Sequence, residues 1–162
     1  MLFDFEVIHC FEPSGLARRE LDGISDNRVI VHPFGLASRD GDATLYQGQL
    51  SFSASLFPDK LNVDPSNTEA CKIRRASRWL KANIVPGDLI VAKINAEGAE
   101  VEILEDLEKA GLLQRFKHLI AFLMPTRRPH SPHEGLCLSS GWVELGRVFG
   151  RQRMFSRARQ RT

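Results

Sequence analysis

Two short apolar segments, joined by an amphipathic one, constrain the fold of this chain more than any other feature of its sequence. The apolar segments are Leu89–Ile94 and residues 118–124, and neither alternates regularly between polar and apolar residues. Between them, residues 97–110 carry apolar side chains at helical spacing and end before Gly111, which favours the end of a helix. Strands that are apolar on both faces lie in covered sheets, and a strand–helix–strand order gives a parallel pair. We therefore predict an α/β fold with a mostly parallel sheet.

The rest of the chain adds further strands and two shorter helices. An apolar segment at residues 5–11 is closed by Glu12-Pro13, and Ser14 can cap a helix that ends near Leu21. The other predicted helix is Ala76–Asn83. Further strands are predicted at 28–33, 43–47 and 71–75, with a C-terminal antiparallel hairpin of 142–148 and 153–157, a loop at 35–38, and a polar excursion outside the core at 48–68. This order indicates a single domain with its antiparallel strands at an edge.

Length and composition exclude several classes of protein. The chain has 162 residues, of which 43% are hydrophobic and 26% are charged. That is enough for one packed core, and it is unlike collagen or a disordered chain. No segment approaches the roughly 18 apolar residues of a membrane span, and the N-terminus lacks the pattern of a signal peptide. We therefore expect a cytoplasmic protein.

The cysteines and histidines give no pattern typical of a metal site. Cys10, Cys71 and Cys137 form no CxxC pair, so we expect reduced and mostly buried thiols. Residues 130–134 (HSPHE) include side chains that can bind metals. Two prolines in and beside this segment favour a surface loop instead, so no metal site is predicted.

Charge is distributed unevenly along the chain. Residues 1–114 carry 12 Lys and Arg against 18 Asp and Glu, whereas residues 115–162 carry 10 against 2. The basic C-terminal end, residues 147–162, can bind phosphate or nucleic acid, or it can be a solvated tail. Only Phe149 and Phe155 interleave its arginines, which favours the solvated tail.

Polar residues follow two predicted strands at their carboxyl ends, where open α/β sheets bind ligands. Glu12 follows the first strand, and Asn95, Glu97 and Glu100 follow Leu89–Ile94. A carboxylate in the position of Glu12 can accept hydrogen bonds from both hydroxyls of a ribose. The alternatives are a solvated strand-end carboxylate for Glu12 and, for the two later acids, simple stabilisation of the helix dipole.

Four sequence segments occur in an order typical of one enzyme family. They are FEVIHCFEP, VIVHPFGLASRDGDATLY, SFSASL and LIVAKINAEGAEVEILEDL. In this order and spacing they resemble the FkbM-type family of S-adenosylmethionine-dependent methyltransferases. The resemblance covers residues 5–107, and its most specific part is KINAEGAE at residues 93–100.

The resemblance implies a Rossmann-like class I methyltransferase sheet that binds S-adenosylmethionine. It also implies transfer of a methyl group to a hydroxyl of a sugar or another small molecule. Matched to the family motifs, Glu12 would hold the ribose hydroxyls of the cofactor. Gly35, Leu36 and Ala37 would line its adenine.

The same resemblance implies that Asn95 and Glu97 face the methyl donor and the acceptor. Transfer to a hydroxyl needs positioning and a base that takes up the hydroxyl proton. Glu97 is the better candidate for that base, because the amide of Asn95 does not titrate.

The chain departs from the family pattern in two places. The family has a first strand and an Asp-x-Gly-x-Asn-x-Gly loop before the FEP strand, and no such loop precedes Glu12; the family's Asp is Asn95 here. We therefore expect a truncated or degenerate member, a partial domain missing the first strand and helix. Its neighbouring strands would lack backbone partners and be open to a homo-oligomer or a partner chain. The alternative is a non-catalytic interaction module that keeps the fold without cofactor binding.

Overall fold

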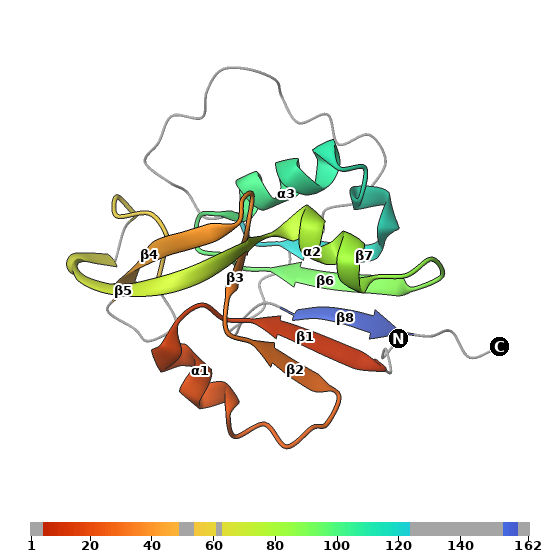
Figure 1. Ribbon diagram of the computed structural model, residues 1–162, viewed down its shortest axis with the longest axis horizontal. Helices are drawn as coiled ribbons and strands as arrows, with labels where there is room; N and C mark the ends of the chain where they lie inside the picture. The colour runs from red at the N-terminus through yellow and green to blue at the C-terminus, as the bar shows by residue number, and fades with distance from the viewer. Residues whose placement is uncertain (1–4, 49–53, 61–62, 124–153, 159–162) are drawn as a thin grey trace.

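The computed structural model describes residues 5–48, 54–60, 63–123 and the backbone of 154–158 (Figure 1). This part of the chain forms two sheets and three α-helices, so the predicted mixed α/β class is confirmed. The elements in chain order are β1 (Val7–Phe11), α1 (Gly15–Leu21), β2 (Val29–His32), β3 (Gly35–Ala37), β4 (Gly41–Gly48), β5 (Val63–Arg75), α2 (Ala76–Asn83), β6 (Leu89–Ile94), α3 (Glu100–Lys109), the 3₁₀ turn η1 (Leu113–Arg115), β7 (Phe116–Ala121) and β8 (Met154–Ala158).

The larger sheet has the strand order β2-β1-β8-β6-β7. β1 and β2 are parallel, and so are β6 and β7. β8 lies between these two pairs and is antiparallel to both β1 and β6. An antiparallel C-terminal strand was predicted, but its expected place at an edge is wrong, because β8 lies in the middle of the sheet. Residues 142–148, the other half of the predicted hairpin, lie outside the described residues.

The central position of β8 also corrects the prediction that neighbouring strands lack backbone partners. Cys10 of β1 and Lys93 of β6 both lie opposite Met154, and the pairing continues along β8 on both sides. The backbone groups of β1 and β6 that we expected to be open to a partner chain therefore face β8. β1 and β6 are thus paired on both sides, whereas β2 and β7 are the outermost strands of the described sheet, so association with a second copy or a partner chain stays a prediction.

The smaller sheet has the order β3-β5-β4, with β3 parallel and β4 antiparallel to β5. Two predictions are wrong here. Residues 35–37 form a short strand and not a loop, because they pair with the end of β5. Residues 48–68 are not wholly outside the core: β5 starts at Val63, and Ala54 belongs to a buried cluster with Leu45 and Ile73.

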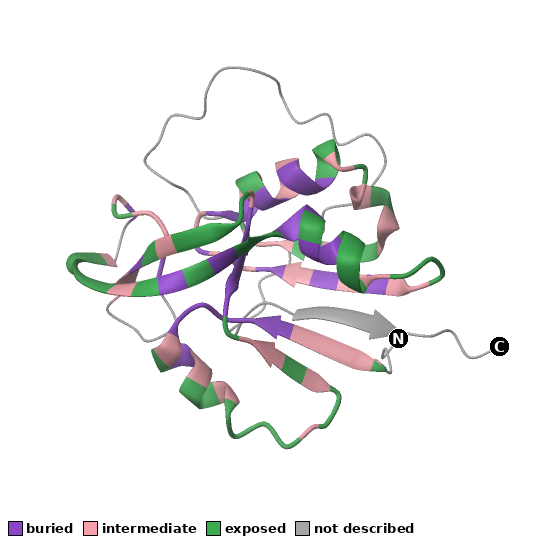
Figure 2. Ribbon diagram, viewed as in Figure 1, coloured by how far each residue is buried: buried purple, intermediate pink, exposed green. Residues whose placement is uncertain are grey.

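The main core lies between the larger sheet and the helices α2 and α3, which lie side by side over β6 (Figure 1). Trp79 and Leu80 of α2 and Ile103 and Leu107 of α3 are buried there with Ile94 of β6. Figure 2 shows that burial continues along β3 and over the carboxyl end of β1.

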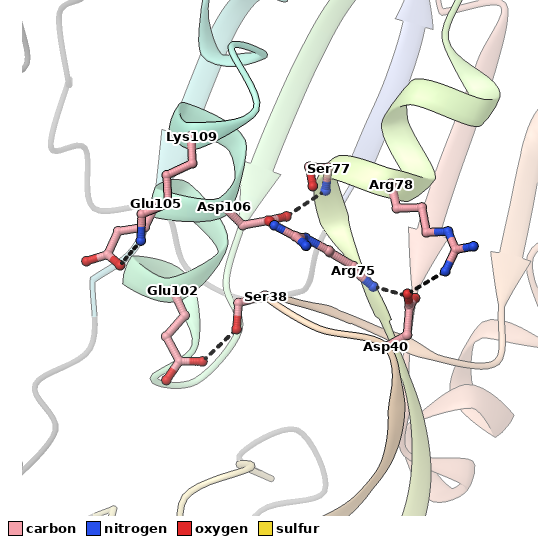
Figure 3. Close-up of polar contacts among 9 residues, drawn as sticks. All are labelled: Ser38, Asp40, Arg75, Ser77, Arg78, Glu102, Glu105, Asp106 and Lys109. Carbon is pink, nitrogen blue, oxygen red and sulfur yellow. Dashed lines mark hydrogen bonds and ion pairs between the residues drawn. The ribbon is translucent and has the colours of Figure 1, made fainter.

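A carboxylate from α3 caps the start of α2. Asp106 accepts a hydrogen bond from the Ser77 N–H (2.8 Å) and one from the Arg75 guanidinium (2.6 Å) (Figure 3). The side chain of Arg75, the residue before α2, makes no capping hydrogen bond to the helix. Asp106 therefore accepts from a helix N–H that would otherwise lack an acceptor. This contact fixes α2 against α3.

Other features of the described residues bear on earlier predictions. Cys10 and Cys71 are both buried, as expected, whereas Cys137 and residues 130–134 lie outside the described residues. Burial raises the pKa of Cys10. Within the residues that the structure describes, no helix is long and apolar enough to cross a membrane.

Candidate functional site

The carboxyl ends of β1 and β6 lie at the same edge of the larger sheet. Both strands are antiparallel to β8, so they are parallel to each other. Cys10 and Lys93 lie at one level, opposite Met154, so Glu12 and Asn95, each two residues further on, leave the sheet at one level too. Two strand spacings separate them, which is about 10 Å between backbones. The fold thus gathers the two strand ends that the sequence singled out.

Glu12 is almost completely buried and helps to start α1. The residue is only 2% exposed, and its Oε1 accepts a hydrogen bond from the Ser14 N–H (2.9 Å). The Arg18 guanidinium donates to the carbonyl oxygens of Glu12 and Pro13 (3.1 and 2.9 Å). The interpretation of Glu12 as a solvated strand-end carboxylate is therefore wrong.

A second carboxylate, Glu69 of β5, lies beside the same helix start. Its Oε1 accepts from the Gly15 N–H (2.8 Å), and its Oε2 accepts from the Ser14 hydroxyl (3.2 Å) and the Gln47 amide (2.9 Å). Sequence reasoning missed Glu69, because it lies between the polar excursion predicted at 48–68 and the strand predicted at 71–75. The N-terminus of α1 thus brings together carboxylates from both sheets.

The three residues predicted to line adenine lie in β3 and are buried. Gly35 packs against Pro13: a Cβ there would lie 3.3 Å from Pro13 Cγ, tighter than ordinary contact. Leu36 belongs to the main core. Ala37 lines a hollow of about 330 Å³ on the smaller sheet, which Glu12, Asn95 and Glu97 do not line. Gly35 is therefore the member of this trio that lies beside the Glu12 strand end.

Glu97 has a backbone conformation that residues other than glycine rarely adopt. Its φ is +53°, in the left-handed region, and Gly98 follows with a φ of +113°. A non-glycine residue there costs free energy and persists only where its surroundings impose it. Glu97 is 9% exposed and forms an ion pair with the buried Lys60, and the Ser55 hydroxyl donates to its carbonyl oxygen (2.6 Å). The turn after β6 is thus held from the segment at residues 54–60.

Glu100 holds the same turn from the other side. Its carboxylate accepts hydrogen bonds from the N–H groups of Ala96 (2.6 Å) and Gly98 (2.9 Å), and the residue is 1% exposed. Glu100 is therefore a positioning residue for Glu97. Asn95 is half-buried at the start of the turn. Helix α3 begins at Glu100 and not at 97, since residues 97–99 form this turn.

Lys60 and Ser55 are site residues that the sequence did not reveal. Ser55 lies in the SFSASL segment, and Lys60 follows five residues later. Neither residue lies in a periodic pattern, and nothing local indicates that this segment folds back on the turn after β6. A lysine buried against a carboxylate is recognisable only once the tertiary structure is known.

Comparison of the chain with models of protein families, with curated protein sequences and with solved structures finds no match.

The side-chain chemistry at this edge is compatible with S-adenosylmethionine. A carboxylate at the end of a parallel strand can hold ribose hydroxyls. Gly35 packs closely on Pro13 and has no side chain, so only backbone lies there beside the Glu12 strand end. Burial sets a condition on binding. Glu12 is 2% and Leu36 8% exposed, so a ligand reaches them only when the groups that cover them move aside.

Proposed function

We propose that this chain is an S-adenosylmethionine-dependent methyltransferase that acts on a hydroxyl of a sugar or another small molecule. The observation that carries the proposal is the common level of Glu12 and Asn95 at one edge of the sheet. The resemblance of residues 5–107 to FkbM-type enzymes supplies the reaction class. The left-handed Glu97, held by three side chains, supports a functional role for the turn after β6.

Each residue at the edge has a distinct part in this proposal. Glu12 holds the ribose hydroxyls of the cofactor, and Gly35 lies against the adenosine. When bound, S-adenosylmethionine supplies a methyl group on a positively charged sulfur. Lys60 pairs with Oε2 of Glu97, so Oε1 is the atom that takes the proton of the acceptor hydroxyl.

Calorimetric titration with S-adenosylmethionine and with S-adenosylhomocysteine tests the proposal. We expect micromolar binding, and we expect Glu12→Gln to weaken it by at least about tenfold, or 1.4 kcal/mol. Glu108→Gln, an equal loss of charge on the exposed face of α3, is the matched control and keeps wild-type affinity. Absence of binding at millimolar ligand would overturn the proposal.

The engaged carboxylates favour a second candidate, a non-catalytic module that keeps the fold. Glu12 bonds the Ser14 N–H, Glu97 pairs with Lys60, and Glu100 bonds the turn after β6. In that case the wild-type chain binds neither S-adenosylmethionine nor S-adenosylhomocysteine at millimolar concentration, and Glu12→Gln changes only the free energy of unfolding. The third alternative, phosphate or nucleic-acid binding by residues 147–162, stays a prediction, because most of that segment lies outside the described residues.

A further inference from the structure

A hollow of about 330 Å³ on the smaller sheet is distinct from the edge that carries Glu12. It lies between β3, β4, β5, the segment after Ser55 and α3. Its volume is at the lower end of the range for small-molecule sites. The lining residues that carry the argument are Ser38, Arg39, Thr44, Tyr46, Phe57 and Glu102.

Opposite charges line this hollow. Arg39 is exposed, and among the residues that the structure describes it has no ion-pair partner. Glu102 of α3 accepts a hydrogen bond from the Ser38 hydroxyl at Oε2 (3.2 Å), which fixes the carboxylate against the end of β3 (Figure 3). One hydroxyl does not saturate a carboxylate, which has about four acceptor positions. The hollow therefore offers one site for an anionic group and one for a cationic group.

The edge of β4 adds main-chain donors and acceptors. The Tyr46 N–H donates to the Ser55 carbonyl (2.7 Å) and the Ser55 N–H to the Tyr46 carbonyl (2.9 Å), so these Tyr46 groups point away from β5. The backbone N–H and C=O groups of successive residues point to opposite sides of a strand. Those of Thr44, two residues before Tyr46, therefore point to the same side as those of Tyr46. Beyond Ser55 the chain turns away, with the Phe57 N–H bonded to the Ser55 hydroxyl. No described residue pairs with Thr44 on that side.

The remaining lining is apolar. It includes Leu56, Phe57 and Ile73, together with Ala37 and Ala43. Ile73 is buried, and Leu56 and Phe57 are half-buried. An apolar body of a few carbon atoms or one ring can lie against this lining.

We propose that this hollow binds a small zwitterion, an α-amino acid with an apolar side chain. Its carboxylate pairs with Arg39 and accepts from the Thr44 N–H. Its ammonium group donates to Glu102 and to the Thr44 carbonyl, and its side chain lies against Leu56 and Phe57. A guanidinium is well suited to a carboxylate, because it presents two parallel donors. The proposal does not depend on methyl transfer, since neither Glu12 nor Glu97 lines the hollow.

Three matched probes test the proposal: L-phenylalanine, 3-phenylpropanoate, which lacks the ammonium group, and 2-phenylethylamine, which lacks the carboxylate. Binding is measured from the amide NMR signals of Thr44 and Phe57 during titration. We expect L-phenylalanine to bind about tenfold more tightly than either analogue. Arg39→Gln should weaken the binding of L-phenylalanine and of 3-phenylpropanoate by about fivefold to tenfold and leave the binding of 2-phenylethylamine unchanged. Glu102→Gln should weaken the binding of L-phenylalanine and of 2-phenylethylamine by the same factor and leave the binding of 3-phenylpropanoate unchanged.

Arg19→Gln on α1 and Glu108→Gln on α3 are controls for loss of exposed charge, and both should bind as the wild type does. The amide spectrum of each variant shows whether it is folded. Equal affinity for the three probes, or no saturable shift at millimolar L-phenylalanine, would overturn the proposal. Titration with S-adenosylhomocysteine on the same samples reports on the methyl-donor edge separately.

Discussion

The strained backbone of Glu97 and its ion pair with Lys60 are the most informative features at the scale of single residues. The side chains of this pair are only 6% and 11% exposed. Two charges removed from water pay a large desolvation cost, so such a pair contributes little net stability while intact. Its role is to hold Glu97 in place, and the consequence appears when one partner is removed.

We predict that Lys60→Met lowers the free energy of unfolding by about 3–5 kcal/mol, because it leaves the Glu97 carboxylate buried without its cation. The exposed pair of Lys72 and Asp42, with side chains 71% and 77% exposed, gives the matched control. Lys72→Met should cost less than about 1 kcal/mol. Urea denaturation measures both values. Equal losses for the two variants would show that Lys60 does not hold Glu97 as described.

At the scale of elements, an aromatic cluster fixes α2 on the β1–β2 pair. The rings of Phe11 and His32 stack at 4.7 Å, and Trp79 of α2 meets Phe11 edge-on at 4.7 Å. His9 Nδ1 and His32 Nε2 lie 3.0 Å apart, a hydrogen bond that requires one of them to accept. Burial, together with the charges of His9 and Arg74, lowers the pKa of His32 from 6.5 to about 4.

This lowered pKa predicts a pH-dependent stability. Unfolded His32 takes up a proton near pH 6.5, whereas folded His32 stays neutral down to about pH 4. Its contribution to stability is therefore complete above pH 6.5 and is lost as the pH falls from 6.5 through about 4. His32→Gln should flatten the stability profile in this window, whereas the exposed His118→Gln should not. A wild-type slope in His32→Gln, measured by urea denaturation at several pH values, would contradict the shift.

The sequence predicts those elements whose residues carry a local pattern. Ala76–Asn83 and Leu89–Ile94 have the predicted bounds, and Ser14 caps α1 by accepting from the Ala17 N–H (3.3 Å). β5 could not be predicted in full, because its first half (VDPSNTE) contains Pro, Asn and Asp, which disfavour strands. Its pairing with β4 overrides that local preference. The partners of Glu97, which are Lys60 and Ser55, arise from such long-range contacts, so the burial of Glu97 could not be foreseen either.

At the scale of the whole molecule, β8 joins the β1–β2 and β6–β7 pairs into one sheet. Without it, the two parallel pairs would share only the helical layer above them. By pairing with Cys10 on one side and Lys93 on the other, β8 fixes the level at which Glu12 and Asn95 leave the sheet. The proposed methyl-donor site therefore depends on residues that are far apart in the sequence.

Amide NMR during titration with S-adenosylhomocysteine tests this shared edge most directly. The amides of Ser14 and Gly35 report on the Glu12 strand end, and that of Gly98 reports on the turn after β6. We predict that all three signals shift together with a single dissociation constant in the micromolar range, and that the amide of Lys109, at the far end of α3, does not shift. Shifts at only one of the two strand ends, or none at millimolar ligand, would contradict a common site.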